Sequence, residues 1–231
     1  MNLNFYKSVI VFFIFSFFQD LRAQEVTELK KNSYITFNLL TPTISYVPRY
    51  NLGYYKKISE RLVLGSEIGF GNYNSSFGLG KSYVISRNNQ VFEIKPELMF
   101  ILNKKRNTKM FVSTDFSYIN HKEIFKNDNF QDLNDSKYYS YDSANYLREK
   151  FTFNLNYGMI IHFGNRFGII PKVGLGYRIR NVKFTNIVNK REDMPSDATD
   201  GFDFYSSGYN DTKGNVSGFN FSLDAKIFYK I

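Results

Sequence analysis

The sequence predicts an all-β fold, in which eight antiparallel strands close into an up-and-down transmembrane β-barrel behind a cleaved N-terminal signal peptide. Three observations lead to this prediction. Apolar and polar residues alternate with a period of two through eight segments of the 231-residue chain. Along these segments, one face carries large apolar side chains and the other carries most of the charges. The connections between the segments alternate between short and long, as in outer-membrane barrels.

The first 23 residues have the pattern of a signal peptide. Lys7 precedes the run SVIVFFIFSFF at positions 8–18, which is apolar apart from its serines. The run is too short for a membrane-spanning helix, which needs about 20 apolar residues. A small residue, Ala23, then stands before Gln24. We therefore expect cleavage after Ala23 and a mature domain of residues 24–231, the alternative being an uncleaved anchor.

The eight alternating segments follow one another from residue 35 to the C-terminus. Many are about ten residues long, the length that a tilted transmembrane strand needs. The last one, FNFSLDAKIFYKI, is apolar at every odd position from Phe219 to Ile231. Pro96 and Pro171 lie inside two segments, where each removes a ladder hydrogen bond and where we expect a local bulge. The segments are 35–40, 49–55, 62–71, 92–102, 110–118, 151–163, 167–180 and 219–231.

The polar face of these segments carries the charges and most of the strand glycines. An eight-stranded barrel is just wide enough inside for side chains, which excludes a large aqueous pore. Buried charges must then pair with one another, because an unpaired buried charge is costly. We expect a charge network in the lumen formed by Arg49, Glu67, Glu93, Lys95, Glu97, Asp115, Lys172, Arg178, Arg180, Asp224 and Lys226.

Symmetric strand pairing predicts which residues of this network face each other in two cases. Pairing about the link 56–61 places Arg49 opposite Glu67. The same reasoning places Glu97 opposite Asp115. This like-charge pair needs a cation, for which Lys95 and Lys172 are the candidates.

The connections place the two ends of the barrel. The short links are 56–61, 103–109 and 164–166, whereas the long ones are 41–48, 72–90, 120–148 and 181–217. Short turns at one end and long loops at the other are typical of outer-membrane barrels. Both termini then lie on the short-turn side, and we expect the last strand to pair with the first so that no edge is left.

On these features the chain resembles the small OmpA/OmpX-type outer-membrane β-barrel families of Gram-negative bacteria, especially those of Bacteroidota. The signal ending Ala23-Gln24 is similar to theirs. The C-terminal residues Ile227, Tyr229 and Ile231 resemble their assembly signal, although an isoleucine replaces the final aromatic residue. The resemblance implies a monomer in the bacterial outer membrane, in contact with outer-membrane lipid and with the barrel-assembly machinery.

Few residues offer catalytic or metal-binding chemistry. The chain has no cysteine and only two histidines, His121 and His162, and no set of nucleophile, base and orienting group is visible. We therefore expect no enzyme and no cofactor, and keep as an alternative a lipid or peptide hydrolase with His121 at the outer rim. The five aspartates of 181–217 suit either a solvated loop or calcium.

The net charge of +9 raises nucleic acid as a partner, but its distribution excludes this class. The positive excess lies in the short links and on the lumen face, while the long segments 120–148 and 181–217 are slightly acidic. The first of these is rich in tyrosine, which suits recognition. We expect a structural or surface-recognition role through these two loops. A narrow conduit and an accessory of a secretion machine are two further roles that fit the pattern.

Overall fold

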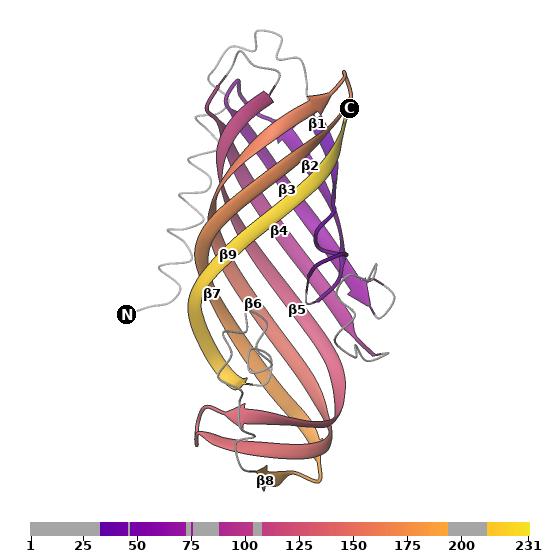
Figure 1. Ribbon diagram of the computed structural model, residues 1–231, viewed down its shortest axis with the longest axis vertical. Helices are drawn as coiled ribbons and strands as arrows, with labels where there is room; N and C mark the ends of the chain where they lie inside the picture. Colours follow the sequence, from indigo (N-terminus) through magenta and orange to yellow (C-terminus); the bar gives the residue numbers. More distant parts are fainter. Residues whose placement is uncertain (1–32, 46, 73–74, 76–87, 104–107, 194–211) are drawn as a thin grey trace, which may run out of the picture. The chain divides into compact units, whose positions relative to one another are not determined.

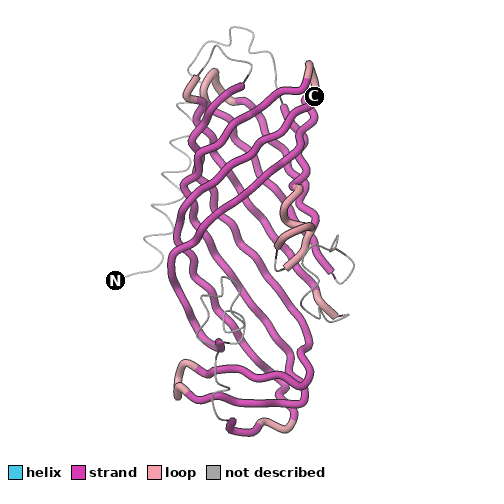
Figure 2. Tube along the Cα trace, viewed as in Figure 1, coloured by secondary structure: helices cyan, strands magenta, loops and turns pink. Residues whose placement is uncertain are grey.

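The computed structural model describes residues 33–45, 47–72, 75, 88–103, 108–193 and 212–231. The chain divides into two units, Met1–Lys31 and Asn32–Ile231, and all described residues belong to the second. They form nine strands and contain no helix (Figures 1 and 2). Within this described part, no helix is therefore long and apolar enough to cross a membrane. The expected signal peptide, residues 1–23, lies outside the described residues.

Eight of the strands close into a hydrogen-bonded ring in which every neighbouring pair is antiparallel. The ring is closed by β9 and β1, where the Ile231 amide donates to the Ser33 carbonyl at 2.9 Å. The eight alternating segments fall in these strands, so the all-β prediction is confirmed. In ring order the strands are β1 (Ser33–Asn38), β2 (Tyr50–Lys57), β3 (Leu62–Asn72), β4 (Gln90–Ile101), β5 (Thr108–Asp132), β6 (Lys137–Phe163), β7 (Phe167–Val188) and β9 (Thr212–Lys230).

The prediction of a long loop at 120–148 was wrong, because most of these residues continue β5 and β6 as paired strands. The two strands pair from Thr108 and Ile161 up to Asp132 and Lys137, and only 133–136 form the turn. The segment 181–217 is likewise only partly a loop: β7 runs on to Val188, and the short β8 (Arg191–Asp193) pairs with β6. Apolar alternation is less regular in the sequence of these stretches, although the backbones remain paired.

The ends of β5 and β6 bend across the ring, and we call residues 123–146 the arching hairpin (Figure 1). Its tip reaches β9, three places away in the ring, where Gln131 and Asp132 pair in parallel with Thr212 and Lys213. Asn127 adopts a φ of 50° at the bend, a conformation that asparagine tolerates better than most residues. The register of the adjoining β6–β7 pair also shifts between Ser143 and Asn145.

The ring reverses the usual distribution of polar and apolar side chains. Large apolar side chains point outward and remain exposed, as with Leu155 (65%), Phe219 (64%) and Leu52 (61%). Charged side chains point inward, where Glu97 is 1% and Lys226 is 0% exposed. The interior of this ring is therefore its polar part.

Neither strand proline produces the expected bulge. Pro96 faces Ser66 on β3, and the register with β5 is the same before it (Ile94↔Tyr118) as after it (Glu97↔Asp115). Pro171 similarly pairs with β9 while the β6–β7 register continues unchanged around it. Each proline lacks the backbone N–H that would donate one ladder hydrogen bond, but the register of its strand does not change.

Candidate functional site

The centre of the ring contains a buried charge network drawn from five strands. Its core is Lys172, whose Nζ lies 2.7 Å from Glu97 Oε1 and 2.9 Å from Asp115 Oδ2. Glu97 and Asp115 are register partners, as symmetric pairing predicts. Lys172, rather than Lys95, supplies the cation between these two carboxylates.

The other two lysines of the network join the remaining carboxylates. Lys226 Nζ donates to Glu97 Oε2 at 2.8 Å and also forms an ion pair with Glu67. Lys95 Nζ lies 2.9 Å from Asp224 Oδ2 and 3.3 Å from Glu67 Oε2. Four carboxylates and three ammonium groups thus neutralise most of one another in a volume that side chains fill.

Sequence reasoning missed the part that uncharged side chains play in this network. The Tyr55 hydroxyl accepts from Lys226 Nζ at 2.6 Å and lies within hydrogen-bond distance of both Glu67 (2.6 Å) and Glu97 (2.9 Å). Asn154 and Asn156 donate to the two oxygens of Asp115 at 2.7 and 2.8 Å. The available signal was strand parity, since Tyr55 shares the polar face of its segment.

Arg49 does not lie opposite Glu67, so this register prediction was wrong. Glu67 pairs with Gly53, and Arg49 instead contacts Glu93 with Nε 2.5 Å from Oε2. The β2–β3 pairing is centred two residues later than the link suggested, because β2 continues to Lys57. Both side chains nevertheless face the interior. Of the two arginines of β7, Arg180 is buried and Arg178 half-buried, beyond the central network.

His121 lies inside the ring at the base of the arching hairpin and is 2% exposed. Its Nε2 is 3.0 Å from Glu123 Oε2, and its ring packs edge-on against Tyr146. Within the described part of the chain, it hydrogen-bonds to no serine or threonine hydroxyl. This buried position differs from that of the accessible base that a rim hydrolase would use.

Apolar side chains close the interior on both sides of the network. At the short-turn end, a cluster that includes Tyr34, Phe111 and Phe228 fills the ring. At the other end, Phe130 of the arching hairpin stacks on Phe184 of β7, with ring centroids 4.6 Å apart. Clusters of buried apolar side chains therefore lie on both sides of the charge network.

The arching hairpin also presents polar contacts at its tip. The Tyr139 hydroxyl donates to Asp135 at 2.5 Å, and Lys190 Nζ lies 3.4 Å from the Tyr139 ring centroid. The hydrogen bond to the Asp135 carboxylate raises the pKa of Tyr139 to about 12. The same bond holds the pKa of Asp135 below its usual value. Tyr139 therefore remains protonated around neutral pH and can donate to Asp135.

Among the residues that the structure describes, no cluster of three histidine, aspartate or glutamate side chains is arranged to hold a metal ion. Four of the five aspartates considered for calcium lie in 194–211, outside the described residues. No family model matches this chain, and a search of curated proteins finds no significant match. The function is therefore inferred from the residues and their geometry.

Proposed function

We propose that this protein is a monomeric outer-membrane β-barrel of the small OmpA/OmpX-like kind, exported by the signal peptide 1–23. The observation that carries the proposal is the outward face of the ring. Soluble monomers rarely expose contiguous apolar patches of more than a few hundred Å². Here exposed Phe, Leu and Ile side chains follow one another along β6, β7 and β9. Lipid is the solvent that stabilises such a surface.

Closure of the ring supports the same proposal. In a bilayer no water satisfies a free backbone amide or carbonyl, so spanning sheets must have no edge. The β1–β9 pairing removes the edge that an open sheet would expose. Ile227 and Ile231 point outward at the end of the chain and are 45% and 55% exposed. Their exposure supports a role, together with Tyr229, as the C-terminal signal for the barrel-assembly machinery.

Within this location we propose a structural or surface-recognition role. The arching hairpin projects beyond the ring and carries exposed Lys137 and half-buried Tyr138 on a paired, well-packed scaffold. The burial of Phe111 and Lys172 inside the ring counts against a narrow conduit. Recognition then resides in the arching hairpin and in the β7–β9 connection, 189–211.

Membrane fractionation combined with gel mobility tests the location and the fold. The protein should co-purify with outer membranes, with a mass that lacks residues 1–23. Unboiled protein should run differently from boiled protein on a denaturing gel, since detergent alone does not open a closed ladder. Recovery in the soluble fraction with identical mobility in both lanes would sink the proposal.

A further inference from the structure

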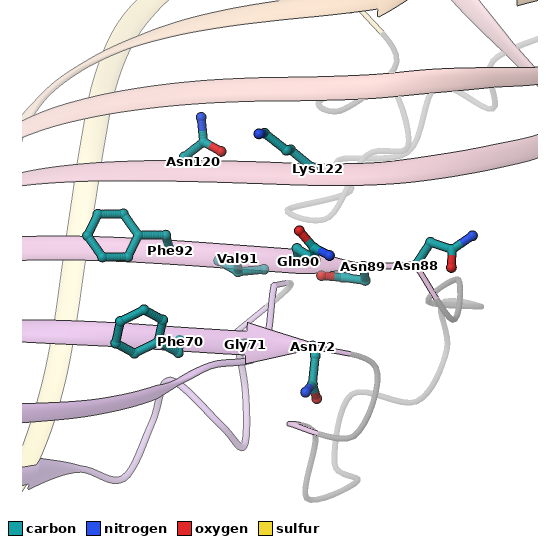
Figure 3. Close-up of a pocket in the computed structure, with 10 residues that line it drawn as sticks. All are labelled: Phe70, Gly71, Asn72, Asn88, Asn89, Gln90, Val91, Phe92, Asn120 and Lys122. Carbon is teal, nitrogen blue, oxygen red and sulfur yellow. The ribbon is translucent and has the colours of Figure 1, made fainter.

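A cavity of about 570 Å³ lies at the end of the ring from which the arching hairpin extends. Figure 3 shows the residues that line it. Its walls come from the end of β3, the start of β4 and the middle of β5. The register places six of its lining residues in two rows that cross these three strands. The rows are Phe70–Phe92–Asn120 and Asn72–Gln90–Lys122.

The two rows mark a change in the chemistry of the outward face. One step earlier along the same strands, the register places Ile68, Ile94 and Tyr118 side by side. Phe70 and Phe92 extend this apolar surface, with ring centroids 5.4 Å apart. The next row has only amide and ammonium groups. In the proposed orientation, this cavity therefore lies where hydrocarbon gives way to lipid headgroups.

The polar lining suits an anionic, hydroxyl-rich group. Of the ten lining residues, Asn72, Asn88, Gln90 and Asn120 carry exposed or half-buried carboxamides, which both donate to and accept from hydroxyls. The fifth carboxamide, Asn89, is buried and donates to Glu123, and no lining residue is a carboxylate. Lys122 is exposed and forms no ion pair with any residue that the structure describes. The nearby outward carboxylate, Glu149, accepts a hydrogen bond from Tyr118 at 3.2 Å. The Lys122 ammonium is thus available to a phosphate.

We propose that this cavity binds the phosphorylated sugar headgroup of a glycolipid in the outer leaflet. Lys122 contacts a phosphate, the carboxamides contact sugar hydroxyls, and Phe70 and Phe92 lie against the first carbons of the acyl chains. The proposal rests on the membrane location proposed above, because only there do the two phenylalanines meet hydrocarbon.

A single-tryptophan reporter makes the binding measurable, because the chain contains no tryptophan. Phe92→Trp protein, refolded in dodecyl maltoside micelles, is titrated with diphosphoryl lipid A, and Phe70→Trp serves as a second reporter. We expect a saturable change in emission, which phosphatidylcholine does not produce. Adding Lys122→Gln should weaken the apparent affinity about tenfold, the effect of losing one charge-assisted hydrogen bond.

Lys183→Gln is the matched control. Lys122, Leu147 and Lys183 share one register row, so Lys183 is an exposed lysine of β7 at the same level but away from the cavity. It should bind lipid A as the reporter parent does. An equal loss in both variants would mean general surface charge and would overturn the proposal. So would glucosamine 1-phosphate binding as tightly as lipid A, which would make the ligand a soluble sugar phosphate.

Gel mobility of the same samples separates this proposal from the one on which it rests. Heat-modifiable protein that shows no saturable lipid A binding defeats the glycolipid site alone. Parent protein that is not heat-modifiable and does not co-purify with outer membranes defeats the membrane location as well.

Discussion

At the scale of single residues, the interior is organised by lysines that each serve two or more carboxylates. Lys172 separates Glu97 from Asp115, and its ion pairs with these two carboxylates are inaccessible to water. Burying such groups is favourable only if each charge has its partners, since the cost of desolvating an ion is several kcal/mol. Removing one lysine therefore lowers the unfolding free energy by more than one ion pair contributes, because two or more buried carboxylates lose a partner.

Lys172→Met tests this arrangement. The variant leaves Glu97 and Asp115 facing each other without their shared cation, and we expect it to lose about 3–5 kcal/mol of unfolding free energy. Urea titration of the folded fraction in detergent, followed by gel mobility, measures the loss. Adding Asp115→Asn should restore part of it, because one carboxylate is then neutral. The exposed Lys183→Met should change stability by less than about 0.5 kcal/mol. Equal stability of Lys172→Met and the parent would refute a shared-cation role.

At the scale of elements, the arching hairpin is the feature that sets this ring apart from a plain set of spanning strands. β5 and β6 have 25 and 27 residues, whereas a transmembrane strand needs about 9–11. The excess residues form a paired extension whose tip is fixed to β9 by the Lys213–Asp132 ion pair at 2.7 Å. Recognition by a fixed hairpin loses less conformational entropy on binding than recognition by a free loop.

Trimming the hairpin separates folding from recognition. Replacing residues 125–144 with Asn-Gly keeps the pair Ile124↔Asn145 and closes it with a two-residue turn. We expect the trimmed protein to remain heat-modifiable, because the ring ladder is intact, and to lose binding to surfaces or partner proteins. Asn165→Ala, in the turn at the other end, should alter neither property. Unchanged binding after trimming would place recognition elsewhere, and a loss of heat-modifiability would make the hairpin part of the folding core.

At the scale of the whole ring, the outward apolar face lets us predict how much an outward-facing arginine lowers the unfolding free energy. Leu155 lies on β6 near the middle of the outward apolar positions and is 65% exposed. In a bilayer, arginine at the midplane costs about 2–4 kcal/mol, whereas an exposed substitution in a soluble protein changes stability by less than about 0.5 kcal/mol.

Leu155→Arg should therefore lower the unfolding free energy in lipid vesicles by about 2–4 kcal/mol. Val188→Arg is the control, because Val188 is also exposed (49%) but ends β7 beyond the apolar positions. Urea titration of vesicle-inserted protein measures both. The membrane proposal fails if the two variants are equally stable.

Period-two alternation by itself determined the all-β fold, the eight ring segments and the faces on which their side chains lie. A side chain's face depends only on parity along a strand, so Glu97, Asp115 and Tyr55 could be assigned to the polar face from local sequence. The prediction that Glu97 lies opposite Asp115 also held, because their strands pair symmetrically about a short link.

Only the tertiary structure decided where the pairing is centred, how far the strands extend and which charges meet. Arg49 contacts Glu93 because β2 continues to Lys57, which moves the β2–β3 pairing. The arching hairpin was missed because its backbone pairing needs no apolar alternation. Lys172 and Glu97 are 75 residues apart in the chain and meet because ring closure brings distant strands to one interior. The cavity likewise depends on three strands lying in register, since no single segment contains both its phenylalanine pair and its lysine.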